Sequence, residues 1–156
     1  MVKFTHIAEG KAQMVDISAK SDVVREAVAT GRIYLRPATL AAIREGTVIK
    51  GNVLATARVA ATLAVKETPR IIPMCHTLHL GAITVDFTEG DTYIEATVTT
   101  KSTGKTGVEM EALTGVSVAL LTIWDMVKSA EKDENGQYPE TRITGIHVVE
   151  KRKGTK

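Results

Sequence analysis

The chain has 156 residues, of which 44% are hydrophobic and 24% are charged, as is usual for a soluble globular protein. Twenty basic and 18 acidic residues leave a formal net charge of +2, and only 4% of residues are aromatic; both values argue against a nucleic-acid-binding protein. The single cysteine excludes an internal disulfide and a multi-cysteine zinc site. No apolar run approaches the roughly 20 residues that span a bilayer, and no signal peptide opens the chain. We therefore expect a cytoplasmic protein of one domain, residues 1–156, with no nucleic-acid or membrane partner.

The N-terminal part of the chain is predicted to hold one strand. Residues 1–10 are expected to form a loose arm, and residues 11–20 a short extended piece. β-Branched residues dominate residues 22–35, and this composition favours a long strand over a helix.

Two helices are predicted next. Pro37 can open a first helix, and Gly46 can end it. Asn52 is a plausible N-cap for a second helix over residues 53–68, which we expect Pro69 to close.

The second half of the chain is predicted to contain a hairpin, a long helix and a last strand. Residues 82–87 and 93–99 flank a Glu-Gly-Asp turn signal, and residues 100–107 form a polar loop. The long helix covers about 108–131, and the last strand covers 141–149.

The predicted order, β-α-α-β-β-α-β, is that of an α+β fold with a ferredoxin-like antiparallel sheet and its helices on one face. Such a sheet leaves its other face uncovered, and a partner subunit is one way to cover it. We therefore expect assembly through subunit interfaces.

The long helix combines an apolar face with a second face that is only partly polar. Residues at helical spacing form the apolar face: Val108, Ala112, Leu113, Val116, Ala119, Leu120, Ile123, Trp124 and Val127. The second face carries Glu111, Thr114, Val118, Leu121, Thr122, Asp125 and Lys128. Asp125 and Lys128 could be an exposed ion pair, or an acid–amine pair whose pKa values are tuned for proton transfer.

The start of this helix carries two further signals. Thr106 and Glu109 have the spacing of a capping box, which needs no ligand. The preceding Gly-Lys-Thr-Gly is not a Walker loop, because Thr99 stands where that pattern requires glycine. Lys50, just before the second helix, could serve an anion site or be a solvated turn lysine.

Cys75, His76 and His79 lie within five positions and leave several interpretations open. They could bind a metal ion, or Cys75 and His76 could form a nucleophilic pair. The commoner fate of a single cysteine is a buried small hydrophobic residue. His76 could also serve as a hydrogen-bonding or acid–base group.

Five segments together resemble the cyclic pyranopterin monophosphate synthase family, also called molybdenum cofactor biosynthesis protein C. They are MVDIS at 14–18, KGNVL at 50–54, IIPMCH at 71–76, TGVEMEALTGVSVALLTIWDMVK at 106–128 and EK at 150–151. The resemblance covers about residues 13–151, and its helix segment is long and specific.

The resemblance implies a reaction and an assembly. The family converts 3′,8-cyclo-7,8-dihydroguanosine 5′-triphosphate to cyclic pyranopterin monophosphate, releases diphosphate, and requires no cofactor in this interpretation. Its fold is ferredoxin-like, its homohexamers are trimers of dimers, and its active site lies at a subunit interface.

The resemblance also implies roles for individual residues. Asp125 and Lys128 match the catalytic aspartate and lysine, and with His76 they could supply the proton transfers that the ring rearrangement requires. Lys50 and Lys151 could stabilise the negative charge of the departing diphosphate. The other matched positions, all substrate-binding or active-site positions, are Met74, Cys75, His76, Glu109, Met110 and Glu111.

The sequence departs from the family pattern in three places. Thr77 stands where the family often has proline, His79 matches no family role, and the chain ends in RKGTK instead of a Gly- and Lys-rich tail. The last seven residues hold four of the 20 basic residues and one of the 18 acidic residues, so the positive surplus lies in the terminal segment. We expect residues 152–156 to form a basic tail.

Two other functions compete with the synthase. One is a non-catalytic ferredoxin-like module that binds a purine triphosphate, as the anion-friendly loops would allow. The other is a metal enzyme that uses Cys75, His76 and His79.

Overall fold

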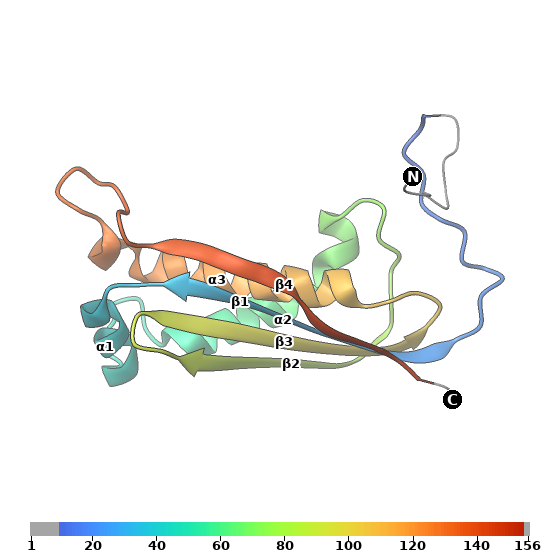
Figure 1. Ribbon diagram of the computed structural model, residues 1–156, viewed down its shortest axis with the longest axis horizontal. Helices are drawn as coiled ribbons and strands as arrows, with labels where there is room; N and C mark the ends of the chain where they lie inside the picture. The colour runs from blue at the N-terminus through green and yellow to red at the C-terminus, as the bar shows by residue number, and fades with distance from the viewer. Residues whose placement is uncertain (1–9, 155–156) are drawn as a thin grey trace.

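The computed structural model describes residues 10–154. The elements follow in the predicted order (Figure 1). The strands are β1 (Val23–Tyr34), β2 (Leu80–Glu89), β3 (Tyr93–Gly104) and β4 (Arg142–Lys153). The helices are α1 (Pro37–Glu45), α2 (Val53–Ile71) and α3 (Glu109–Glu131).

The four strands form one antiparallel sheet in the order β2-β3-β1-β4. This is the strand order of a ferredoxin-like fold, so the predicted fold class is confirmed. The long helices α2 and α3 pack against each other on the same face of the sheet, while α1 lies at one end of it (Figure 1).

Small residues on the central strand bring α3 close to the sheet. Along β1, Ala27, Ala29 and Ile33 point into the core and are fully buried, as period-two alternation requires. Gly31 lies between them, and a β-carbon added there would lie 3.0 Å from Val116 Cγ1 of α3. The long helix therefore has a fixed position on the sheet, and this position orients every candidate site residue that it carries.

The predicted starts and stops of the first two helices are confirmed, except for one end. Gly46 ends α1 in the left-handed conformation (φ 70°), and the Asn52 side chain accepts a hydrogen bond from the Ala55 amide at 2.9 Å. Pro69, however, does not close α2, which continues to Ile71.

The Thr68 side chain explains why α2 continues through Pro69. A proline has no N–H for the carbonyl four residues earlier, which here belongs to Val65. The Thr68 hydroxyl donates a hydrogen bond to that carbonyl oxygen at 2.9 Å, inside the buried core. The expectation that Pro69 ends the helix was therefore wrong, because a neighbouring hydroxyl replaces the missing donor.

The capping box predicted at the start of the long helix does not form. Val108 is the N-cap of α3, and no side chain caps it. The Glu109 side chain forms an ion pair with Lys151 of β4. The predicted polar loop is also shorter, because β3 runs to Gly104 and buries the hydroxyls of Thr100 and Ser102 against backbone carbonyls.

The chain ends differ in part from expectation. Residues 1–9 of the expected N-terminal arm lie outside the described residues, and so do residues 155 and 156 of the expected basic tail. The last strand is longer than predicted, because β4 continues to Lys153. Residues 11–17 have no regular secondary structure, and residues 18–20 form a turn.

By length and composition, α3 is apolar enough to cross a membrane, with a mean hydropathy of 1.4 over its most apolar window. Half of that window is buried inside the molecule, against α2 and strands of the sheet. A helix in the core of a folded domain can have the same length and apolar composition. The apolar composition of α3 is therefore explained by the packing that Figure 1 shows.

Candidate active site

Two lysines from different elements meet one carboxylate on α3. Lys128 Nζ lies 2.6 Å from Asp125 Oδ1, one helical turn away. Lys50, on the loop between α1 and α2, donates to Asp125 Oδ2 at 3.0 Å and to the Asp125 carbonyl oxygen at 2.9 Å. The structure thus brings Lys50 and Asp125 together across 75 positions of sequence. We call Lys50, Asp125 and Lys128 the lysine–aspartate cluster.

The cluster carries one surplus positive charge. Hydrogen bonds from Lys128 and then from Lys50 hold the pKa of Asp125 below its usual range. The same hydrogen bond and the charge of Asp125 raise the pKa of Lys128. The two lysine side chains therefore face one carboxylate, and this arrangement is suited to bind an anion.

An open hollow of about 380 Å³ lies beside the cluster, lined by Leu121, Trp124, Asp125 and Lys128. The Leu121 side chain is 57% exposed. Trp124 packs edge-on against Tyr138, with ring centroids 5.4 Å apart. Charged and apolar groups thus face the same opening, and an additional surface would be needed to enclose a ligand there.

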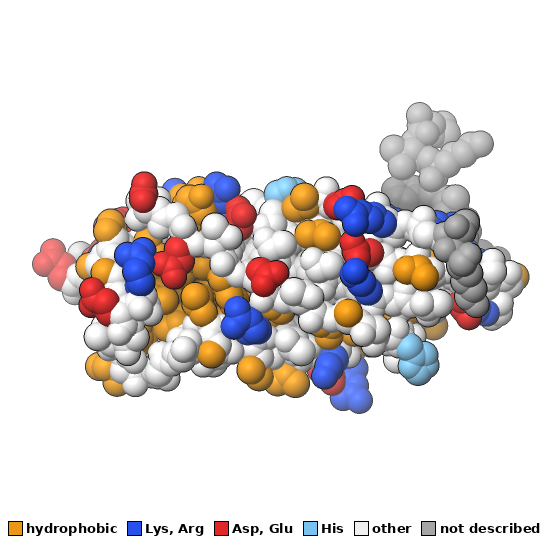
Figure 2. Space-filling model, turned by 90° about the horizontal axis from the view of Figure 1, so that it is seen from below, with side chains coloured by type: hydrophobic (Ala, Val, Ile, Leu, Met, Phe, Trp, Pro, Cys, Tyr) orange, Lys and Arg blue, Asp and Glu red, His pale blue; other side chains and the backbone are white. Residues whose placement is uncertain are grey.

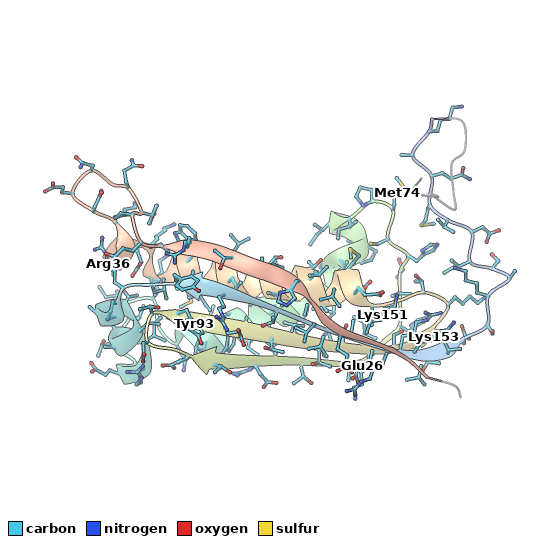
Figure 3. All side chains as sticks on the ribbon, in the orientation of Figure 1. Glu26, Arg36, Met74, Tyr93, Lys151 and Lys153 are labelled. Atoms are coloured by element: carbon cyan, nitrogen blue, oxygen red, sulfur yellow. The ribbon has the colours of Figure 1, made fainter. Side chains whose placement is uncertain are left out.

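A second hollow of about 380 Å³ lies at the other end of α3. Its walls include every residue of the predicted 74–76 and 109–111 segments: Met74, Cys75, His76, Glu109, Met110 and Glu111. Figure 3 shows Met74, after α2, and Lys151, on β4, at this end of the molecule, and Arg36 and Tyr93 at the opposite end. We call this hollow the substrate pocket.

Glu109 is fixed at the mouth of the substrate pocket by Lys151. The two side chains form an ion pair between α3 and β4. Gly107 leaves room for the Glu109 carboxylate, because a β-carbon at that position would overlap it. Burial acts to raise the pKa of Glu109, but hydrogen bonds from Lys151 and from the Glu109 backbone, together with the charges of Lys151 and Arg25, outweigh it and lower the pKa. Glu109 is therefore an anion whose charge Lys151 already balances.

Glu111 and Cys75 share a buried part of the same pocket. The Glu111 side chain is only 3% exposed, although the helix pattern placed it on a partly polar face. Burial, and to a lesser degree the charge of Glu109, raise the pKa of Glu111. Burial and then the charge of Glu111 raise the pKa of the Cys75 thiol. A thiol held in its neutral form is a poor nucleophile, so this geometry does not support a catalytic cysteine.

His76 faces the segment before β1 instead of Cys75. Its Nε2 lies 2.7 Å from the carbonyl oxygen of Val15, which accepts the hydrogen bond. Within residues 10–154, no group of three or more His, Cys, Asp or Glu side chains is arranged to hold a metal ion. The interpretation of Cys75, His76 and His79 as metal ligands was therefore wrong for this fold, since the three do not converge.

Comparison with known proteins places the chain in a family. The MoaC family model matches residues 14–154. The chain belongs to the MoaC family. It is 88% identical over 154 residues to a protein of Methanoregula boonei named "Probable cyclic pyranopterin monophosphate synthase", with 99% of both chains covered. Proteins with the same name from Methanosphaerula palustris and Thermococcus onnurineus are 70% and 58% identical, over 99% and 97% of this chain and 100% and 97% of theirs.

The family residues identified from sequence fall into two separate groups within one chain. Lys50 lies with Asp125 and Lys128, and Lys151 lies with the substrate pocket. Asp125 and Glu109 are 16 positions apart on one helix, which corresponds to roughly 24 Å at the rise of an α-helix.

Sequence reasoning assigned no role to Val15, Ile17 and Lys20, which line the substrate pocket from the segment before β1. They belong to the MVDIS segment and the residues just after it. The MVDIS segment was part of the resemblance, so the sequence did mark Val15 and Ile17 as lying in a family motif. Its position over the pocket depends on contacts with residues far away in sequence, which spacing does not reveal.

Proposed function

We propose that this chain is a cyclic pyranopterin monophosphate synthase, a lyase of molybdenum cofactor biosynthesis. It converts 3′,8-cyclo-7,8-dihydroguanosine 5′-triphosphate to cyclic pyranopterin monophosphate and diphosphate. Relatives with this name match the chain along its whole length at identities up to 88%. The observation that carries the proposal is the Asp125 carboxylate held between two ammonium groups beside an open hollow.

In this proposal Asp125 and Lys128 are the catalytic pair. Formation of a cyclic phosphate joins a hydroxyl oxygen to the first phosphorus atom, and the hydroxyl proton is released to a base. The bond between that phosphorus atom and the diphosphate breaks, and the diphosphate leaves with the added negative charge. Lys50 is placed to stabilise that charge, because its ammonium group lies beside the pair. Asp125 keeps Lys128 protonated, so that Lys128 can donate a proton.

The substrate pocket supplies the binding residues of the proposal. Its volume of about 380 Å³ lies within the range of small-molecule sites. Met74, Cys75 and His76 form one wall, and Glu109, Met110 and Glu111 form another. Lys151 forms an ion pair with Glu109, and in this proposal a phosphate group of the substrate competes with Glu109 for the Lys151 ammonium group.

The complete site is proposed to form between subunits of a cytoplasmic homohexamer that is a trimer of dimers. A separation of roughly 24 Å along α3 is too large for one substrate to contact Glu109 and Asp125 of the same chain. The exposed Leu121 side chain and the open hollow beside it offer a surface for a second copy. An α3 helix of a partner could then place its own substrate pocket opposite the lysine–aspartate cluster.

The decisive experiment gives the purified chain the authentic cyclic nucleotide intermediate and measures cyclic pyranopterin monophosphate. We expect product from the wild type, and a loss of kcat on the order of 10²- to 10⁴-fold in Asp125→Asn and Lys128→Ala, because the pair transfers protons in the transition state. Lys132→Ala, an exposed lysine just after α3, is the matched control. Full turnover in either catalytic variant would refute its role, and tight binding without product would favour the non-catalytic binding module.

A further inference from the structure

A short segment before β1 forms the outer wall of the substrate pocket. We call residues 14–20 the N-terminal strap. Val15, Ile17 and Lys20 line the pocket, opposite the walls that α3 and residues 74–78 provide. Two hydrogen bonds hold the strap to the body: His76 Nε2 to the Val15 carbonyl oxygen at 2.7 Å, and Lys105 Nζ to the Ser18 carbonyl oxygen at 2.7 Å.

The strap ends in a turn that fixes the position of Lys20. Asp16 Oδ1 accepts a hydrogen bond from the Ser18 amide at 2.8 Å, and the Lys20 amide donates to the Ile17 carbonyl oxygen at 3.0 Å. Hydrogen bonding to Ser18 lowers the pKa of Asp16, and the charges of Lys105 and His76 lower it further. Asp16 therefore remains an anion, and its hydrogen bond with Ser18 shapes the turn that precedes Lys20.

The charge of Lys20 is not balanced within the pocket. Lys20 is the only lysine that lines the pocket among the described residues, and it forms no ion pair with any of them. The two carboxyl groups in the lining cannot balance it fully. Glu109 is already paired with Lys151, and Glu111 forms no ion pair with Lys20. The pocket thus holds an ammonium group that is available to an anionic ligand.

We propose that Lys20 is a further substrate-binding residue that contacts a phosphate group of the substrate, and that Lys105 positions it through the Ser18 carbonyl. The proposal rests on the proposed function, because the triphosphate of that substrate supplies the anion. Lysine is suited to this role as a mobile point charge with three N–H donors. The strap brings that charge to the pocket from outside the elements that form the rest of the site.

The first test compares Lys20→Ala and Lys20→Arg with Lys11→Ala. Lys11 is an exposed lysine just before the strap and does not line the pocket. We expect KM for the cyclic nucleotide to rise about tenfold or more in Lys20→Ala, because one charge-assisted hydrogen bond is lost. Lys20→Arg should recover most of that loss, and Lys11→Ala should match the wild type. Equal KM values for Lys20→Ala and Lys11→Ala would overturn the proposal.

A second test does not depend on turnover. Inorganic diphosphate, the released product, serves as the probe, and its affinity is measured by isothermal titration calorimetry. We expect Lys20→Ala to weaken diphosphate binding about tenfold relative to Lys11→Ala. If the wild type makes no product but shows this difference, the proposed function fails and the anion-binding role of Lys20 stands. No difference between the two variants would refute that role whether or not the wild type is active.

The positioning role of Lys105 is tested through its coupling to Lys20. Lys105→Met should raise KM with little change in kcat, and Lys105→Arg should restore KM, since it can still donate to the Ser18 carbonyl. The double variant of Lys20→Ala and Lys105→Met should have a KM close to that of Lys20→Ala, because the residues act as one unit. Independent, multiplicative effects on KM would show that Lys105 does not act through Lys20.

Discussion

Two carboxylates on α3 have opposite electrostatic surroundings. Asp125 is exposed and flanked by Lys128 and Lys50, which lower its pKa. Glu111 is buried near Glu109, and its pKa is raised. Residue type alone would give the two groups similar pKa values. The helix therefore presents one carboxyl group whose pKa is lowered by neighbouring lysines and, near its other end, one whose pKa is raised by burial.

Glu111→Gln tests the second of these environments. The pKa of Glu111 is higher in the folded protein than its ordinary 4.5. Folding therefore becomes less favourable as the pH rises from the pKa of the unfolded state through the pKa of the folded state, because the group must then be ionised in a buried position. We therefore expect Glu111→Gln to gain free energy of unfolding relative to the wild type as the pH rises from about 4 to 7. Urea unfolding at several pH values measures this, with Glu134→Gln on an exposed turn as control. A difference that does not change with pH would contradict the raised pKa.

At the scale of elements, the contact between α2, α3 and the sheet depends on the absence of a side chain at Gly115. A β-carbon added there would lie 2.7 Å from Val65 Cγ2 of α2 and 3.0 Å from Val98 Cγ1 of β3. Both valines are fully buried and β-branched, so neither can move away easily. A glycine in the middle of a helix is thus explained by close packing and not by a kink or a turn.

Gly115→Ala sets two effects against each other. Alanine favours a helix by about 1 kcal/mol over glycine, whereas overpacking a core costs about 1–3 kcal/mol. The distance of 2.7 Å is shorter than real contacts of a β-carbon, so we expect overpacking to dominate and the variant to lose about 1–2 kcal/mol of stability. Thermal unfolding measures this. Val65→Ala in the same chain should recover part of the loss, and a more stable Gly115→Ala would show that the helices can separate freely.

At the scale of the whole molecule, the two groups of site residues lie far apart and both are open. The lysine–aspartate cluster and the substrate pocket are separated along α3, and each hollow lacks a cover on one side. Figure 2 shows acidic and basic side chains intermingled on one side of the molecule, with apolar side chains among them. This side of the molecule therefore carries no large patch of a single charge.

Mixed oligomers test whether partners share the site. Asp125→Asn and His76→Ala should each be inactive alone, because each removes one half of the site. Co-expressed with different tags and isolated together, they should recover up to about a quarter of wild-type activity, since random pairing creates some sites with both halves intact. Light scattering should show a hexamer. A monomer, or mixed oligomers with no activity, would place the whole site within one chain.

Local signals in the sequence determined the order of the elements. Pro37, Gly46 and Asn52 act within one helical turn, and strand alternation is likewise local, so both could be read without a fold. The end of α2 was misjudged, because the effect of Pro69 depends on the hydroxyl of its buried neighbour Thr68. The sequence motifs also predicted which residues belong to the candidate site, but they did not predict how those residues are arranged in space.

Tertiary structure decided which of those residues meet. Lys50 reaches Asp125, Lys151 reaches Glu109, and the N-terminal strap reaches the substrate pocket only after the sheet and the helices have packed. The burial that raises the pKa of Glu111 has the same origin. Electrostatic interactions and desolvation depend on distances in space, and for residues so far apart in the chain those distances are set by the fold and not by the spacing in the sequence.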